Sequence, residues 1–178
     1  FNTDRPPLDN VLVRKALTLA VDREQIVKHI TRRGEISAYS YTPPIEGSYE
    51  PPNLIRFDPE LARKTLAEAG YPEGKGLPKF DLKMNTHEVH RVVAEAIQEM
   101  WRKHLGINVG LSNQEWKVFQ QSVTRQEYEI SRAGWIGDYI DPTTFLDMWK
   151  TGDSNNNTGW GSKDYDRLLE EAALAPNP

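Results

Sequence analysis

The sequence has no cysteine among its 178 residues, no excess of basic residues and no long apolar run. The missing cysteine excludes disulfides, thiol redox chemistry and thiolate-bound zinc. The 22 Lys and Arg against 26 Asp and Glu give a formal net charge of −4, so nucleic-acid binding through a broadly basic surface has no support. No apolar stretch approaches the roughly 18 residues that cross a membrane. Aromatic residues form 10% of the chain, which is enough for the core of one domain or one lobe.

The two ends of the sequence favour a piece of a longer protein. The chain begins at Phe1 without Met and without a charged-then-apolar leader, and residues 175–178 form a tail that ends a helix. We therefore expect a processed or excised segment, in which a missing signal peptide carries no information on localisation. No internal repeat or linker divides residues 1–178, so we expect a single unit.

Apolar periodicity predicts helices first and then alternating strands and helices. The predicted helices are 12–21, 22–34, 58–69, 89–101, 116–123, 142–149 and 162–174, and the predicted strands are 80–84, 107–111 and 128–132. Asp9 and Asp22 are the expected caps of the first two helices. Alternating strands and helices are typical of an α/β layer structure with a mostly parallel or mixed sheet.

Residues 36–56 form a long irregular stretch between the second and third helices, with Pro43, Pro44 and Gly47 among them. A loop of this length without its own secondary structure is often functional. It also carries aromatic side chains, including Tyr39 and Tyr41. We therefore expect this loop to do more than connect two helices.

Motifs for catalysis and metal binding are weak or absent. His87 and His90 stand three residues apart, whereas the zinc helix motif needs a spacing of four. A solvated first helical turn is the simpler interpretation of this pair. The sequence lacks a nucleophile elbow, a phosphate loop and a dinucleotide fingerprint. Asp138 and Asp141 could form a hydrolase carboxylate pair, but Asp141 before Pro142 is explained more simply as a helix cap.

The segment from Ser131 to Pro142 is the unusual part of the sequence. It follows a predicted strand and places Arg132, Trp135 and Asp138 within seven residues. Ligands of open α/β sheets bind at the carboxyl edge of the strands. An Arg and an Asp beside a large aromatic would suit a zwitterion with an apolar body. The alternative is an internal Arg132–Asp138 ion pair with Trp135 in the core, and residue types alone do not decide between the two.

Several stretches of the chain resemble one known family. They are residues 12–17 with 20–23, residues 38–44, the Ala-x-x-Leu-Ala-Glu-Ala-Gly helix at 62–70, Asn-Gln-Glu-Trp-Lys at 113–117, Arg-Ala-Gly-Trp at 132–135 and Asp-Tyr at 138–139. Together they resemble the C-terminal lobe of the oligopeptide-binding proteins that serve bacterial ABC importers. The helix patterns mark the wider family, which includes dipeptide, haem and nickel carriers, and the two Trp-containing stretches resemble the oligopeptide branch.

The resemblance implies a fold, a location and a set of partners. The fold would be a periplasmic-binding-protein-like α/β lobe with a mixed sheet flanked by helices. Residues 1–178 would be one C-terminal lobe of a two-lobed, hinged receptor whose N-terminal lobe is missing here. The partners would be short peptides and the membrane subunits of an ABC permease. The location would be the periplasm, or the cell surface as a lipoprotein in a Gram-positive source. No cofactor, metal or catalytic step is implied.

The resemblance also assigns expected roles to individual residues. Asp138 matches the carboxylate that pairs with the peptide's α-ammonium group, and Arg132 matches a residue that can bind the terminal carboxylate of short peptides. Trp135 matches a residue lining the cleft, and Trp116 one lining a side-chain pocket. Tyr39 and Tyr41 lie in a matching loop, where pocket roles are expected for both. The alternatives are another solute on the same fold, such as a dipeptide, murein peptide, nickel complex or haem, and, less favoured, a carboxylate-pair hydrolase.

Overall fold

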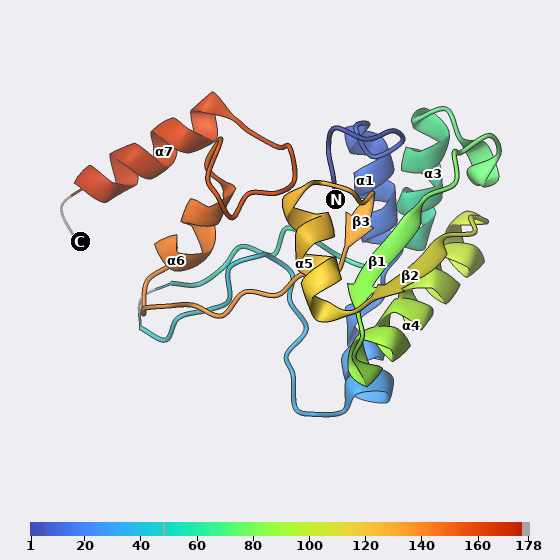
Figure 1. Cartoon of the computed structure of the whole chain (residues 1–178), viewed down its shortest axis with the longest axis horizontal. Coiled ribbons are helices and arrows are strands. Elements are labelled where there is room, and N and C mark those ends of the chain that lie inside the picture. The colour runs from blue at the N-terminus through green and yellow to red at the C-terminus, as the bar shows by residue number, and fades with distance from the viewer. Residues whose placement is uncertain (48, 176–178) are drawn as a thin grey trace.

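The computed structural model describes residues 1–47 and 49–175 and contains a small parallel sheet with helices on both of its faces (Figure 1). Its helices are α1 (Val11–Leu19), α2 (Arg23–Gln25), η1 (Ile26–Thr31), α3 (Pro59–Glu68), η2 (Pro72–Gly74), α4 (Glu88–Leu105), α5 (Trp116–Thr124), α6 (Thr143–Leu146), η3 (Asp147–Trp149) and α7 (Lys163–Leu174). Its strands are β1 (Asp81–Asn85), β2 (Gly110–Gln114) and β3 (Ile130–Ser131). The predicted α/β class is confirmed.

The strand order is β2-β1-β3, and both pairs are parallel, so the sheet formed by the described residues is parallel and not mixed. The register pairs Leu82 with Leu111 on one side and with Ile130 on the other. From β1 the chain moves to one edge through α4, and from β2 it returns past β1 through α5. Because such crossovers are right-handed, these two moves in opposite directions put α4 and α5 on opposite faces. The direction in which the chain moves across the sheet therefore reverses between β1 and β3.

The core lies between the sheet and the packed helices α1, α3 and α4. Leu8, Val13 and Leu17 are fully buried in it, as is Ala62 of α3. Trp101 of α4 is 3% exposed, and its indole N–H donates a 2.8 Å hydrogen bond to the Leu17 carbonyl oxygen of α1. That bond satisfies a carbonyl near the end of α1, where helical partners run out.

Several helices begin at the capping residues that the sequence predicts, but the first helix does not. Asp22, Asp58 and Ser162 cap their helices through side-chain oxygens that accept from backbone N–H groups. The cap of α1 is Asn10 and not the predicted Asp9, since the Asn10 side-chain oxygen accepts from the Leu12 N–H at 2.9 Å. Asn and Asp serve equally well at this position, so composition could not separate two neighbours.

Several predicted elements differ in extent, among them β2, which was expected at 107–111 and spans Gly110–Gln114. The second helix begins as α2 and continues as the π-helix η1, which ends at Thr31 and not at Gly34. The N–H of Arg32, the C-cap, bonds to the Val27 carbonyl five residues back. The helix predicted at 142–149 divides into α6 and the 3₁₀ turn η3. Strand β3 is only two residues long, because the Asn2 side chain, and not β1, binds the carbonyl oxygens of Gln126 and Tyr128 at 3.0 Å.

Residues 36–56 are irregular, as predicted, with one isolated bridge between Ile45 and Tyr49. In Figure 1 this loop runs beside the segment that joins β3 to α6. Tyr41 connects the loop to η3, since its ring lies edge-on to that of Trp149 at 4.9 Å between ring centroids. None of the helices described is both long and apolar enough to span a membrane.

Candidate functional site

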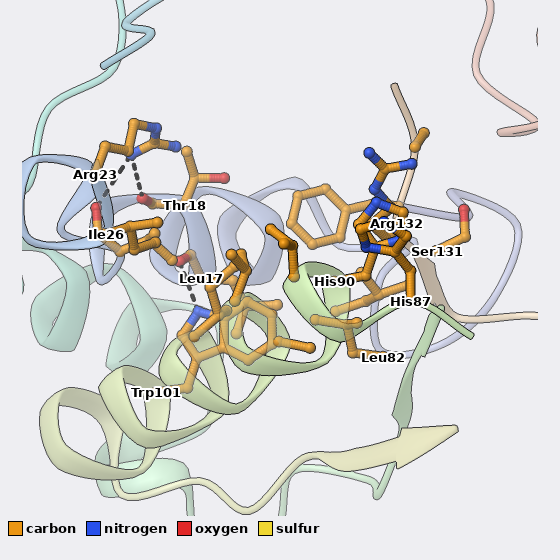
Figure 2. Close-up of a pocket in the computed structure, with 18 of the residues that line it drawn as sticks. Leu17, Thr18, Arg23, Ile26, Leu82, His87, His90, Trp101, Ser131 and Arg132 are labelled. Carbon is orange, nitrogen blue, oxygen red and sulfur yellow. Dashed lines mark hydrogen bonds between the residues drawn. The ribbon is translucent and has the colours of Figure 1, made fainter. Parts of the chain in front are cut away.

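The carboxyl ends of β1 and β3 flank the point where the chain direction switches, which is where open α/β sheets bind ligands. A cavity with a volume of about 680 Å³ is lined by Leu82 of β1 and Ile130 of β3. Helix α4 follows β1 and brings His87 and His90 to the cavity, and Arg132 follows β3. Figure 2 shows these three side chains gathered at one end and Arg23 at the other.

The charge of this cavity is one-sided. Arg23, Arg33 and Arg132 line it, and no Asp or Glu belongs to its described lining. Burial lowers the pKa of the Arg132 guanidinium below its usual value, but an arginine keeps its charge in proteins. Gly134 stands beside the guanidinium, because a Cβ there would lie 3.3 Å from Arg132 Nη2. The polar end of the cavity is therefore suited to an anion such as a carboxylate.

The two imidazoles form a pair at the same end. The ring centroids of His87 and His90 are 4.5 Å apart. His90 Nδ1 lies 2.9 Å from the side-chain oxygen of Asn85, the last residue of β1. If Nδ1 carries the proton, the bond to Asn85 leaves Nε2 free. Burial, followed by the positive charge of Arg132 and then by His87, lowers the pKa of His90.

Asp138 lies outside the cavity on the exposed segment between β3 and α6. Its backbone N–H donates to the Thr144 hydroxyl at 2.9 Å, which fixes the segment to α6. Gly137 packs closely there, since a Cβ would lie 3.0 Å from the Phe145 ring. Among the described residues, no ion pair joins Asp138 to Arg132, so the internal pair considered above does not form. Both charged groups remain available to a ligand.

The two tryptophans lie on different connections. Trp135 follows β3 and is partly buried; its indole Nε1 is buried without a hydrogen-bond partner among the described residues. Trp116 begins α5 after β2, is 50% exposed and stacks on Phe119 at 6.1 Å between centroids. Trp135 thus offers a free donor, and Trp116 an open aromatic surface.

The two loop tyrosines make contacts within the lobe. The Tyr39 hydroxyl donates to the Glu24 carboxylate, a bond that lowers the pKa of Glu24. The Tyr41 hydroxyl contacts Met148 Sδ at 2.7 Å. Tyr41 also lines a second cavity of about 440 Å³ with Trp149, Trp160 and Tyr165. Both tyrosines therefore hold the loop in place, and neither lines the larger cavity.

Asp141 is not the cap predicted for α6, but it contacts the start of that helix. Its side chain accepts hydrogen bonds from the Thr143 hydroxyl at 2.6 Å and the Thr143 N–H at 2.9 Å. These bonds lower the pKa of Asp141, the hydroxyl bond contributing most. They also hold the start of α6, although the helix itself is capped one residue later, at Pro142. Within the described part of the chain, no cluster of three or more His, Asp or Glu could hold a metal ion.

Comparison with known proteins identifies the family. The model of the bacterial extracellular solute-binding proteins, family 5, in its middle part, matches residues 1–157. The chain belongs to this family. Members are receptors that bind solutes, and the fold agrees with that of their solved structures.

Similar members of family 5 include oligopeptide-binding proteins. The chain is 39% identical over 180 residues to the oligopeptide-binding protein OppA of Bacillus subtilis, covering 97% of this chain and 33% of that protein. It is 39% identical to the periplasmic oligopeptide-binding protein OppA of Salmonella typhimurium over 96% of this chain and 32% of that one. A crystal structure of OppAIV from Borrelia burgdorferi superposes with a TM-score of 0.94 at 40% identity, covering 99% of this chain and 36% of that one. The chain therefore spans about a third of the length of these family members.

His87 and His90 are the site residues that sequence reasoning missed. Their spacing excluded the zinc motif, and a solvated helical turn was the resulting prediction. His87 is exposed at the start of α4, in agreement with that prediction, and the structure also places both side chains in the cavity lining with Arg132. The signal was present, because both follow the carboxyl end of a predicted strand, the same position that drew attention to Arg132.

Proposed function

We propose that this chain is the C-terminal lobe of the substrate-binding component of a bacterial ABC importer, and that it binds short peptides by their two charged ends. The separation of Arg132 from Asp138 carries this proposal. The two opposite charges leave the sheet edge on one segment, and neither neutralises the other. A zwitterionic ligand held at both ends would satisfy both groups.

The distances available suit a short peptide. Asp138 comes six positions after Arg132, so their Cα atoms are at most about 22 Å apart. An extended tripeptide measures about 10 Å, and both side chains can reach toward it. Asp138 would pair with the α-ammonium group, and Arg132, with the His90 imidazole beside it, would bind the terminal carboxylate. Both ion pairs require removal of water, which enclosure by a second lobe would supply.

The rest of the protein would supply the second lobe. Main-chain hydrogen bonds to an extended peptide give affinity without reading side chains, and bridging waters allow varied side chains to fit. Closure of the lobes would then be recognised by the membrane subunits of the permease. The site of action would be the periplasm, or the cell surface in a Gram-positive source. No catalytic step is part of this function.

The test is calorimetric titration of the parent protein with unblocked and N-acetylated tripeptides. We expect acetylation to weaken binding by about 2–5 kcal/mol, because it removes one partner of a desolvated charge pair. Asp138→Asn should weaken binding of the unblocked peptide on the same scale and add little to the effect of acetylation. Asp141→Asn is the matched control and should leave binding unchanged, because its carboxylate is occupied by the Thr143 N–H at the start of α6.

Each other result has a definite meaning. Failure of unblocked peptides to bind the parent protein would contradict peptide binding and favour another solute on the same fold. If peptides bind but acetylation and Asp138→Asn have no effect, the receptor function stands and the role of Asp138 is wrong.

A further inference from the structure

Arg23, at the end of the cavity away from Arg132, is a cation without an acidic partner. It is partly buried and lines the cavity. Its Nη1 donates to the carbonyl oxygens of Val21 at 3.1 Å and Thr18 at 3.4 Å. Within residues 1–47 and 49–175, no carboxylate forms an ion pair with it. Because a guanidinium has five N–H donors, the two bonds from Nη1 leave donors for a ligand.

The acidic neighbours of Arg23 in sequence are engaged elsewhere. Asp22 accepts from the Gln25 N–H at 3.0 Å as the cap of α2, and Glu24 accepts from the Tyr39 hydroxyl. Burial is the largest cause that lowers the pKa of Arg23, although an arginine keeps its charge in proteins. This cation is therefore partly withdrawn from water, and an anionic group of a ligand would offset the cost of that withdrawal.

One face of helix α4 forms the wall between the two ends of the cavity. His90 and, seven residues later, Ile97 lie on this face and line the cavity. The Asp22 N–H donates to Met100 Sδ at 3.4 Å, so the start of α2 lies beside Met100. Met100 comes ten positions after His90, which is about 15 Å along the helix axis. The Arg23 side chain spans part of this distance (Figure 2).

We propose that the Arg23 end of the cavity binds an acidic side chain on the last residue of the peptide, so that peptides ending in glutamate are preferred. This inference rests on the proposed function, in which Arg132 binds the terminal carboxylate. The side chain of the last residue then starts beside Arg132 and extends into the cavity towards Arg23. The mainly apolar wall suits the methylene groups of glutamate, and the far end supplies the cation.

Other side chains at this position would bind less well. A neutral side chain would leave the charge of Arg23 unpaired behind the ligand. A lysine side chain would meet the arginines of the lining, and like charges brought together in an enclosed site oppose binding. The cavity should therefore rank the last residue of a peptide by its charge.

The experiment is calorimetric titration of the parent protein with Ala-Ala-Glu, Ala-Ala-Gln and Ala-Ala-Lys. We expect Ala-Ala-Glu to bind roughly 5- to 50-fold more tightly than Ala-Ala-Gln, which has nearly the same shape, and Ala-Ala-Lys to bind most weakly. Arg23→Gln should remove the preference for glutamate, and Arg23→Lys should keep part of it. Lys28→Gln is the matched control and should keep all of it, because Lys28 of η1 is exposed and stands outside the described lining.

Equal affinity of the wild type for the glutamate and glutamine peptides would overturn this inference, and that comparison does not depend on the folding of any variant. A preference for glutamate that persists in Arg23→Gln would contradict the role of Arg23. Both results leave the proposed function intact, provided that trialanine binds. If no tripeptide binds the wild-type parent protein, trialanine included, the proposed function fails and this inference fails with it.

Discussion

His90 and Arg132 illustrate how neighbours set the chemistry of single residues in this lobe. His90 is partly buried, its Nδ1 faces Asn85, and its pKa is lowered by burial and by the positive charge of Arg132. At neutral pH the ring is therefore mainly neutral, and Arg132 carries the charge at the polar end of the cavity. A bound carboxylate would reverse the balance, because it favours the imidazolium form.

This arrangement predicts pH-dependent binding of peptide. A carboxylate raises the pKa of His90 in the complex relative to the free protein, so affinity rises as pH falls through the pKa of the complex and levels off below that of the free protein. We expect a tripeptide with a free carboxylate to bind roughly 3- to 10-fold more tightly at pH 5.5 than at pH 7.5. Titration calorimetry at both pH values checks this.

Two comparisons isolate the cause of that pH dependence. A C-terminally amidated peptide and the variant His90→Gln should each lose it. His104→Gln is the control, because His104 lies at the other end of α4. An equal pH dependence for the amidated peptide would contradict the assignment of this end of the cavity to a carboxylate.

Secondary structure was the level at which the sequence was most informative. The polar caps Asp22, Asp58 and Ser162 and the glycine that ends α4 all act as their chemistry requires, and Gly106 adopts φ 70° there. Such signals can be predicted because they depend only on residues close in the chain. The shortness of β3, in contrast, depends on Asn2, which is more than 120 residues away in sequence. No local sequence pattern could therefore predict the length of β3.

The candidate site was likewise predictable only in part. The alternation of strands and helices predicted that ligands bind at the carboxyl edge of the sheet. It did not predict which residues meet there, because strand order and direction bring Arg132, His87 and His90 together. The contacts of Tyr39 with Glu24 and of Tyr41 with Trp149 are tertiary, so aromatic content alone could not reveal that these tyrosines hold the loop.

The link between α1 and α4 gives a prediction at the level of elements. Trp101→Phe removes the donor to the Leu17 carbonyl and leaves that oxygen buried without it. We expect the free energy of unfolding to fall by about 1–3 kcal/mol, with some further loss from the smaller ring. Denaturant unfolding of the parent protein measures this. Trp116→Phe is the matched control, since Trp116 is half exposed; equal losses in both variants would contradict the importance of the buried bond.

At the scale of the whole molecule, this lobe presents both charged groups of its proposed site on an open surface. Asp138 and Arg132 are both exposed in this lobe. Charge pairs exposed to water contribute little, whereas enclosed and hydrogen-bonded pairs contribute much more. Binding strength should therefore come from the parent protein and not from this part alone.

The isolated 178-residue chain tests that expectation. Provided that circular dichroism shows it to be folded, it should bind tripeptides weakly or not at all, while the parent binds them tightly. Calorimetry under identical conditions compares the two. Submicromolar affinity of the isolated chain would contradict a site completed by a second lobe.

The central claim is that one segment of this lobe holds both ends of a peptide. A crystal structure of the parent protein with an unblocked tripeptide tests it most directly. The account predicts the α-ammonium group at the Asp138 carboxylate and the terminal carboxylate at the Arg132 guanidinium, each at about 2.7–3.2 Å, with His90 beside the carboxylate. A peptide bound in the reverse direction, or bound with Asp138 still facing solvent, would contradict it.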